Sequence, residues 1–176
     1  MPPIRTGLDE RVTSVQKELK DYFEEARHVY ADAIDAFTKL DSEVYNEAKR
    51  ARAKAREMNW DLTNDLLLIL ALNQPLMQDL RIIATYLRAV DTVERLIRHA
   101  RDIARSDRSI DENADQLPTE IVDPVLEMHK SLNSLIDITV HCLTEGQEVP
   151  ADEVRTHWRN VKSSHAKAVA ALSNLK

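Results

Sequence analysis

The chain has 176 residues, of which 43% are hydrophobic and 31% charged, so it can bury one good core or two small ones but cannot form a large multidomain enzyme. It contains only two glycines, Gly7 and Gly146, where an average composition would give about twelve. Glycine-rich phosphate loops, dinucleotide fingerprints and nucleophile elbows all need glycine where the backbone turns tightly. Two glycines are too few to build any of these motifs. We therefore assign the chain no reaction.

The formal charge of -6 argues against a protein whose main function is to bind nucleic acid nonspecifically over its whole surface. The run from Lys49 to Arg56 is rich in basic residues, but no aromatic residue interleaves to stack a base, which favours a solvated helix face. A single cysteine, Cys142, excludes an internal disulfide framework and fits a reducing compartment. Since no apolar run suggests a signal peptide or a membrane span, we expect a cytoplasmic protein.

The first half of the chain predicts three long helices. Apolar residues recur at alternating steps of four and three over residues 8–40, as in a long amphipathic helix. A very short turn at Asp41 or Ser42 then implies an antiparallel second helix, whose broadly apolar stretch at residues 66–72 we expect in the core. Gln74-Pro75 ends this helix, because proline cannot continue an interior helix, and a third helix runs from there to about Ser106.

The second half predicts two more helices beyond a polar, acidic linker at residues 107–117. The fourth helix stops at Gly146 and Pro150. The fifth has an apolar stripe that includes Trp158 and Leu172, and His165 falls on this stripe as an expected core histidine. No segment alternates like a strand, so the expected fold is all-α. The expected units are residues 8–106, the linker at 107–117, and residues 118–176.

The junction between the second and third helices carries a recognisable motif. An Ala-x-x-Gln-Pro sequence is followed by Asp-Leu-Arg and later by Glu-Arg, and the residues are Ala71, Gln74, Pro75, Asp79, Leu80, Arg81, Glu94 and Arg95. This pattern resembles the signature of the PhoU family, and the resemblance covers about residues 8–106. It implies long antiparallel helices in a PhoU-like three-helix bundle, with two further helices of an incomplete second repeat. The chain is then either a naturally short family member or a fragment.

The resemblance implies a non-enzymatic regulator or adaptor of phosphate transport and phosphate signalling, which works by protein contacts at the cytoplasmic face of the membrane. The implied partners are the ATPase component of a phosphate transporter and a phosphate-sensing kinase, with membrane contact through these partners only. Two alternatives are a helical oligomerisation scaffold without the phosphate role and a carboxylate metal-binding bundle. The candidate residues for partner binding or a polar core are Gln74, Pro75, Asp79, Arg81, Arg88, Glu94 and Arg95.

A two-helix unit leaves an apolar stripe uncovered, which has to pack on the first bundle or on another chain. We therefore expect a homodimer.

Some PhoU-like proteins bind iron or zinc through Glu-x-x-x-Asp motifs, whose carboxylates share one face of a helix. In this chain the corresponding pair on the third helix is Glu94 and Arg98, and the pair on the second helix falls on Asn59 and Thr63. Neither motif is intact, so we expect no cofactor. A shifted acidic series on the second helix points elsewhere, since two positions rotate a helix by about 200°. The remaining candidates for iron or zinc are Glu94, Glu57, Asp61 and Asp65.

Arg81, Arg88 and Arg95 are seven residues apart and form a row along the third helix. Such a row could meet phosphate, an acidic partner helix or an anionic lipid head group. The alternative is an exposed face whose arginines pair with Asp91 and Asp102. Glu94 and Arg98, four residues apart, are expected to form an ion pair along the same helix.

Overall fold

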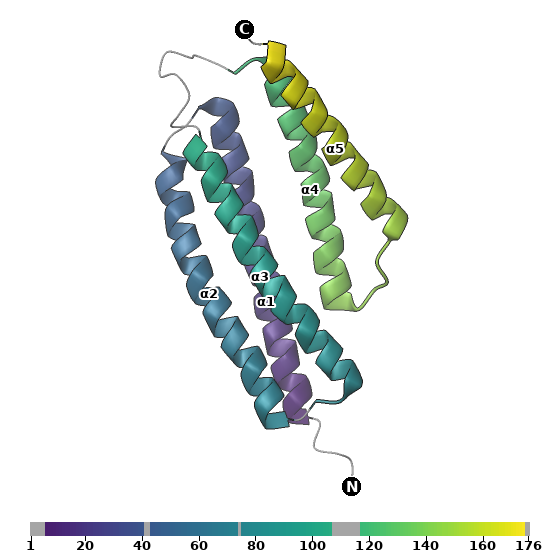
Figure 1. Ribbon diagram of the computed structural model, residues 1–176. Coiled ribbons are helices and arrows are strands. Elements are labelled where there is room, and N and C mark those ends of the chain that lie inside the picture. The colour runs from purple at the N-terminus through teal and green to yellow at the C-terminus, as the bar shows by residue number, and fades with distance from the viewer. Residues whose placement is uncertain (1–5, 41–42, 74, 107–116, 175–176) are drawn as a thin grey trace.

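The computed structural model describes residues 6–40, 43–73, 75–106 and 117–174. These residues form five helices and no strand, which confirms the all-α prediction (Figure 1). The helices run up and down in turn along one long axis. Their bounds are α1 Thr6–Lys39, α2 Val44–Asn73, α3 Met77–Ser106, α4 Thr119–Glu145 and α5 Ala151–Asn174.

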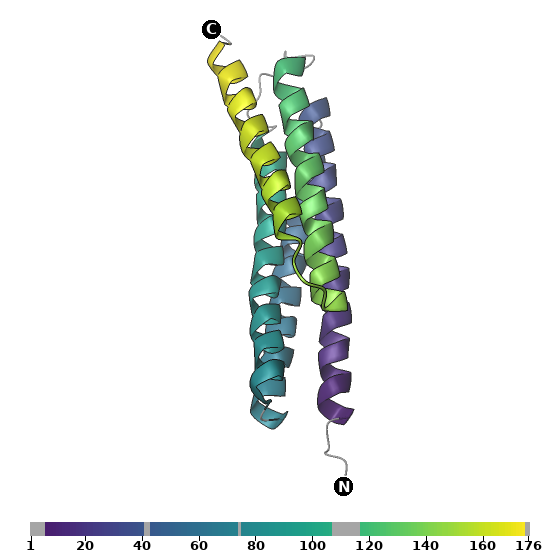
Figure 2. The same ribbon diagram turned by 90° about the vertical axis from the view of Figure 1, so that its right-hand side faces the viewer.

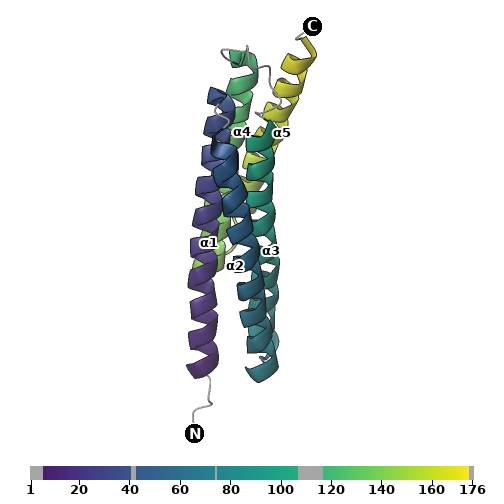
Figure 3. The ribbon, with the colours of Figure 1, turned by 90° about the vertical axis from the view of Figure 1, so that its left-hand side faces the viewer.

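Helices α1, α2 and α3 pack against one another and enclose the main core (Figure 3). The predicted spacing of four and three places the apolar residues of α1 on this core, because that spacing keeps one stripe of a helix on one side. At one end the core consists of alanines, Ala33, Ala48, Ala100 and Ala104, which let the helices approach closely. The largest fully buried side chains are Leu19, Tyr22, Leu66, Ile69, Ile83, Val90, Val93 and Ile97.

The helix ends follow the punctuation of the sequence. Pro75 lies two residues before α3, and the carbonyl of Leu76 accepts the first hydrogen bond of that helix from the Leu80 amide at 3.0 Å. Gln74, Asp41 and Ser42 lie outside the described residues. Gly146 follows α4 with φ of 65°, the left-handed conformation that glycine adopts without strain, so the predicted stop is confirmed.

Helix α4 packs along α1 and joins the first three helices to α5 (Figure 2). The Gln16 amide of α1 donates hydrogen bonds to the carbonyls of Leu143 and Thr144, at 3.1 and 2.8 Å. The rings of Tyr30 and His129 stack with their centroids 5.5 Å apart. Burial lowers the pKa of His129, which favours the neutral form of this ring.

Helix α5 packs mainly against α4, with a face that overlaps the predicted stripe only in part. Ser164 and Ala168 are buried, whereas His165 is exposed and Trp158 and Leu172 are 57% and 56% exposed. The prediction of a core histidine at His165 is therefore wrong. Small residues allow α5 to approach α4 closely, and the large side chains of Trp158 and Leu172 next to them are left facing outwards.

The apolar stretch near the end of α2 is also less buried than expected. Leu66 and Ile69 are in the core, but Leu67, Leu68 and Leu72 are about half exposed or more. The prediction that the whole stretch lies in the core is wrong, because a helix with two neighbours on one side cannot bury apolar residues all round. The division into residues 8–106, 107–117 and 118–176 stays a prediction.

Candidate interaction surface on α2 and α3

Helices α2 and α3 run antiparallel, and one polar contact defines their register. The Asn59 side-chain amide donates to the carbonyl of Val90 at 3.5 Å. Glu94 lies one turn beyond Val90 on α3, so the family motif positions of the two helices do meet at the α2/α3 contact. Asn59, however, already presents an N–H group there, and Arg98 adds a fixed cation one turn further along.

This contact does not fit a metal cluster of the family type. A cation needs acceptor atoms, whereas Asn59 donates to the backbone and Arg98 carries a positive charge. The shifted candidates Glu57, Asp61 and Asp65 are all exposed on α2. Within the described ranges, no group of three or more His, Cys, Asp or Glu side chains is arranged to hold a metal ion.

Glu94 is half-buried and lies beside the polar centre of the first three helices. There the buried Tyr22 hydroxyl donates to the carbonyl of Ala55 at 2.8 Å. Burial, together with the negative charges of Glu94 and Asp91, raises the pKa of Tyr22 well above its usual range. Glu94 therefore belongs to the structural interior of the bundle as much as to its surface.

Because the folded-state pKa of Tyr22 is raised, the unfolded chain loses this proton first as the pH rises above about 10. The free energy of unfolding should therefore fall above that pH. Tyr22→Phe should cost about 1 kcal/mol at pH 7, from the lost hydrogen bond, and should make the alkaline loss shallower. Urea unfolding at pH 7 and at pH 10.5 measures both effects.

The control variant is Tyr86→Phe, which removes a longer hydrogen bond of 3.4 Å to the Leu143 carbonyl. It should lower the free energy of unfolding at pH 7 by less than Tyr22→Phe does. An unchanged alkaline loss in Tyr22→Phe would contradict this account.

The predicted ion pair between Glu94 and Arg98 is not formed, since neither side chain has an ion pair within the described residues. The Glu94 carboxylate instead acts on the Tyr22 hydroxyl of α1. A spacing of four residues along α3 was therefore not enough to predict the partner of Glu94. Arg98 is half-buried at the edge of the α2/α3 contact and has no ion pair within the described residues.

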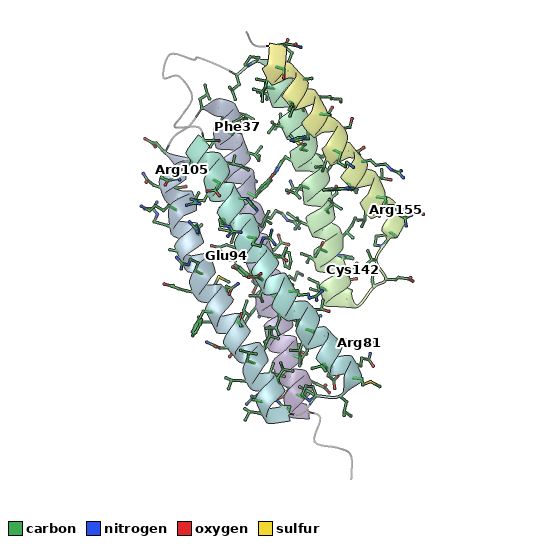
Figure 4. The ribbon with its side chains drawn as sticks, viewed as in Figure 1. Phe37, Arg81, Glu94, Arg105, Cys142 and Arg155 are labelled. Carbon is green, nitrogen blue, oxygen red and sulfur yellow. The ribbon has the colours of Figure 1, made fainter. Side chains whose placement is uncertain are left out.

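Arg81, Arg88 and Arg95, here called the arginine row, are exposed along α3 (Figure 4 labels Arg81 near one end of the helix). Their predicted pairing with Asp91 and Asp102 is wrong. Asp102 pairs with the neighbouring Arg101, and Asp91 has no ion pair in the part of the chain that the structure describes. None of the three arginines pairs with any described carboxylate. The arginine row thus presents three guanidinium groups without an ion pair to any described residue on one face of α3.

A second group of cations lies where α2 and α3 meet, and we call it the basic seam. Arg52 is seven residues before Asn59 and so shares its α3-facing side, and Arg98 and Arg105 are likewise seven apart on α3. Figure 4 shows Arg105 at the far end of α3 from Arg81. Within the described residues none of these groups has an ion pair. The exposed Arg56 lies one turn after Arg52 on α2, so the basic seam consists of Arg52, Arg56, Arg98 and Arg105.

The opposite end of α2 and α3 is apolar, which the sequence analysis missed. Pro75 and Asp79 are half-buried at the turn, and around them Leu72, Leu76 and Met77 are 64%, 68% and 83% exposed. Such exposure of large apolar side chains at one place indicates a contact surface. The sequence did carry a signal for this surface. Its apolar residues continue from the end of α2 across the turn into α3, and they occupy more sides of these helices than the neighbouring helices can cover.

These features define an all-helical protein with long helices, whose α2 and α3 carry exposed arginines and, at one end, exposed apolar side chains. A PhoU domain model matches residues 19–106, and the chain belongs to the PhoU family. That family consists in general of non-enzymatic regulators of phosphate transport. No curated protein and no solved structure gives a significant match. None of the described helices combines the length and apolar character needed to cross a membrane.

Proposed function

We propose that this protein is a non-enzymatic regulator of phosphate transport and phosphate signalling that works by binding other proteins at the cytoplasmic membrane face. Its partners are the ATPase component of a phosphate transporter and a phosphate-sensing kinase. Membership of the PhoU family supports this role. The proposal needs a surface for the contact, and the face formed by α2 and α3 supplies one.

The arginine row is the observation that carries the proposal. Exposed arginines in a protein of net charge -6 would be expected to find carboxylate partners on their own helix, yet these three have none among the described residues. A guanidinium group binds carboxylates through two parallel hydrogen bonds, so a regular row of three suits an acidic helix or strand of a partner. The row thus favours docking of an acidic protein surface.

Two neighbouring features extend this docking surface. The basic seam adds four cations towards the end of α3, and the exposed Leu72, Leu76 and Met77 add apolar area at its start. Protein interfaces typically combine a few apolar anchors with charged groups that orient the partner. The expected partner surface is therefore acidic along most of its length and apolar at one end.

The proposal is tested by immobilising the purified chain and passing over it a detergent extract of membranes from the source cell. We expect the transporter ATPase component to be retained at low salt and released as salt is raised, because the contact is largely ionic. Identification of the retained proteins by mass spectrometry gives the readout. Retention of no transporter component would contradict the proposal.

The exposed stripe of α5 favours a second candidate function, an oligomerisation scaffold. Trp158, Val169 and Leu172 are about half exposed or more, and a second copy of the chain would remove them from water. We expect a homodimer by sedimentation equilibrium, and Trp158→Ser with Leu172→Ser should shift it to monomer. Arg159→Ser, also exposed on α5, serves as the control and should remain dimeric. A wild-type chain that stays monomeric at high concentration would contradict this candidate.

A further inference from the structure

A polar cavity of about 370 Å³ lies between α4 and α5, on elements that the docking surface does not use (Figure 2 shows both helices side by side). Most contacts between packed helices are apolar, but this one is lined by hydroxyl, ammonium and amide groups. The residues that matter for its chemistry are Glu127, Lys130, Ser131, Asn160, Ser164 and Lys167.

One donor in the cavity wall has no protein partner within the described residues. Ser131 is only 6% exposed, and its hydroxyl makes no hydrogen bond to any described residue. The ring atom Nδ1 of His157, which also lines the cavity, is buried without a hydrogen bond too. The Ser131 hydroxyl is therefore open to the cavity and available to a polar ligand.

One carboxylate, that of Glu127, lies on the same helix as Ser131, one turn before it. Glu127 Oε2 accepts a hydrogen bond from the buried Ser164 hydroxyl at 2.8 Å and lies 3.1 Å from the Lys167 ammonium. These two contacts hold the pKa of Glu127 below its usual value, so it is ionised at neutral pH. Lys130 provides a second ammonium group and has no ion pair within the described residues. The cavity therefore offers several donors and a single strong acceptor.

We propose that this cavity binds inorganic phosphate. The Ser131 hydroxyl, the Asn160 amide and the two ammonium groups donate hydrogen bonds to its oxygens, as charge-assisted recognition of an oxyanion requires. Inorganic phosphate also keeps at least one P–OH group at neutral pH, and this group donates to the Glu127 carboxylate. The single acceptor thus has a complementary donor on the ligand.

Glu127 selects among anions of similar size. Sulfate carries no proton at neutral pH, so it leaves the carboxylate facing a negative oxygen. A phosphate monoester is mostly a dianion at that pH, since its second pKa is about 6, and it lacks the P–OH group for the same reason. A site built to accept a hydrogen bond rejects ligands that cannot donate one. Free phosphate is therefore preferred to sulfate and to a phosphorylated side chain.

The inference goes beyond the proposed docking function, because the cavity shares no residue with the arginine row or the basic seam. Binding can be measured on the purified full chain without any partner. Its outcome is independent of whether a transporter component is retained.

The test is a calorimetric titration of the full chain at pH 7 and constant ionic strength with orthophosphate, sulfate and O-phosphoserine. We expect saturable binding of orthophosphate, with the other two at least about tenfold weaker. Glu127→Gln should bring the affinities for phosphate and sulfate to within about twofold of each other, and Ser131→Ala should weaken phosphate binding about tenfold. Ser173→Ala on α5, outside the cavity lining, is the matched control and should bind as the wild type does.

Three results would overturn the proposal. The first is no saturable binding of orthophosphate by the wild type. The second is equal binding of sulfate or O-phosphoserine, which would assign the cavity to oxyanions or phosphorylated proteins in general. The third is a Glu127→Gln variant that keeps the phosphate preference while circular dichroism shows it folded, since the carboxylate would then have no part in recognition.

Discussion

Reversing the charges of the arginine row, by Arg81→Glu, Arg88→Glu and Arg95→Glu together, is expected to abolish retention of the transporter ATPase component. Loss of one well-formed ion pair at an interface costs about 2–5 kcal/mol, and about 3 kcal/mol already lowers affinity roughly a hundredfold. The reversed row would in addition repel an acidic partner. The fold should be unaffected, because all three side chains are exposed and none has an ion pair within the described residues.

The matched control for this variant reverses three cations on α1 instead. Arg11, Lys17 and Lys20 are also exposed and without ion pairs among the described residues, so their reversal changes the net charge by the same amount. A chain with these three glutamates should still be retained. Equal loss in both variants would show that net charge, and not the arginine row, governs the contact.

Leu66→Ala is expected to be the most destabilising single substitution in the core. The side chain is fully buried between α1, α2 and α3, and its removal leaves a cavity that helices of this length cannot close. The expected loss is about 2–5 kcal/mol in the free energy of unfolding, measured by urea denaturation followed by circular dichroism.

The neighbouring leucine provides the control for this prediction. Leu67 is 50% exposed, so Leu67→Ala should cost less than about 1 kcal/mol. The two variants differ by one position and have the same composition. A similar loss in both would mean that the core does not lie on the Leu66 side of α2, which would contradict the packing described above.

The fold could be predicted from the sequence because its helices repeat one simple period. Residues such as Val15, Leu19 and Tyr22 recur at steps of four and three, and only a helix keeps them on one side. Pro75 marked a helix end because proline has a fixed φ and no backbone N–H to donate. Gly146 marked another because glycine adopts a positive φ without strain. These signals are local, so they can be read without knowing which helices touch.

The features that could not be predicted depend on contacts between helices. On α5 the choice between a stripe with Trp158 and one with Ser164 follows from the close approach of α4. The partner of Asp102 is Arg101 and not a member of the arginine row, which spacing could not decide. The cavity between α4 and α5 brings Glu127 and Ser131 of α4 against Ser164 of α5, and this arrangement depends on the register of an antiparallel pair.

The most direct test of the proposed regulatory function is phosphate uptake in the source cell, measured with labelled phosphate during growth in low and in high phosphate. Deleting the gene should abolish the normal reduction of uptake in high phosphate, and the wild-type chain should restore it. The variant with the reversed arginine row should accumulate to the same level and fail to restore it. Uptake that is unchanged by the deletion, or fully restored by that variant, would contradict regulation through this surface.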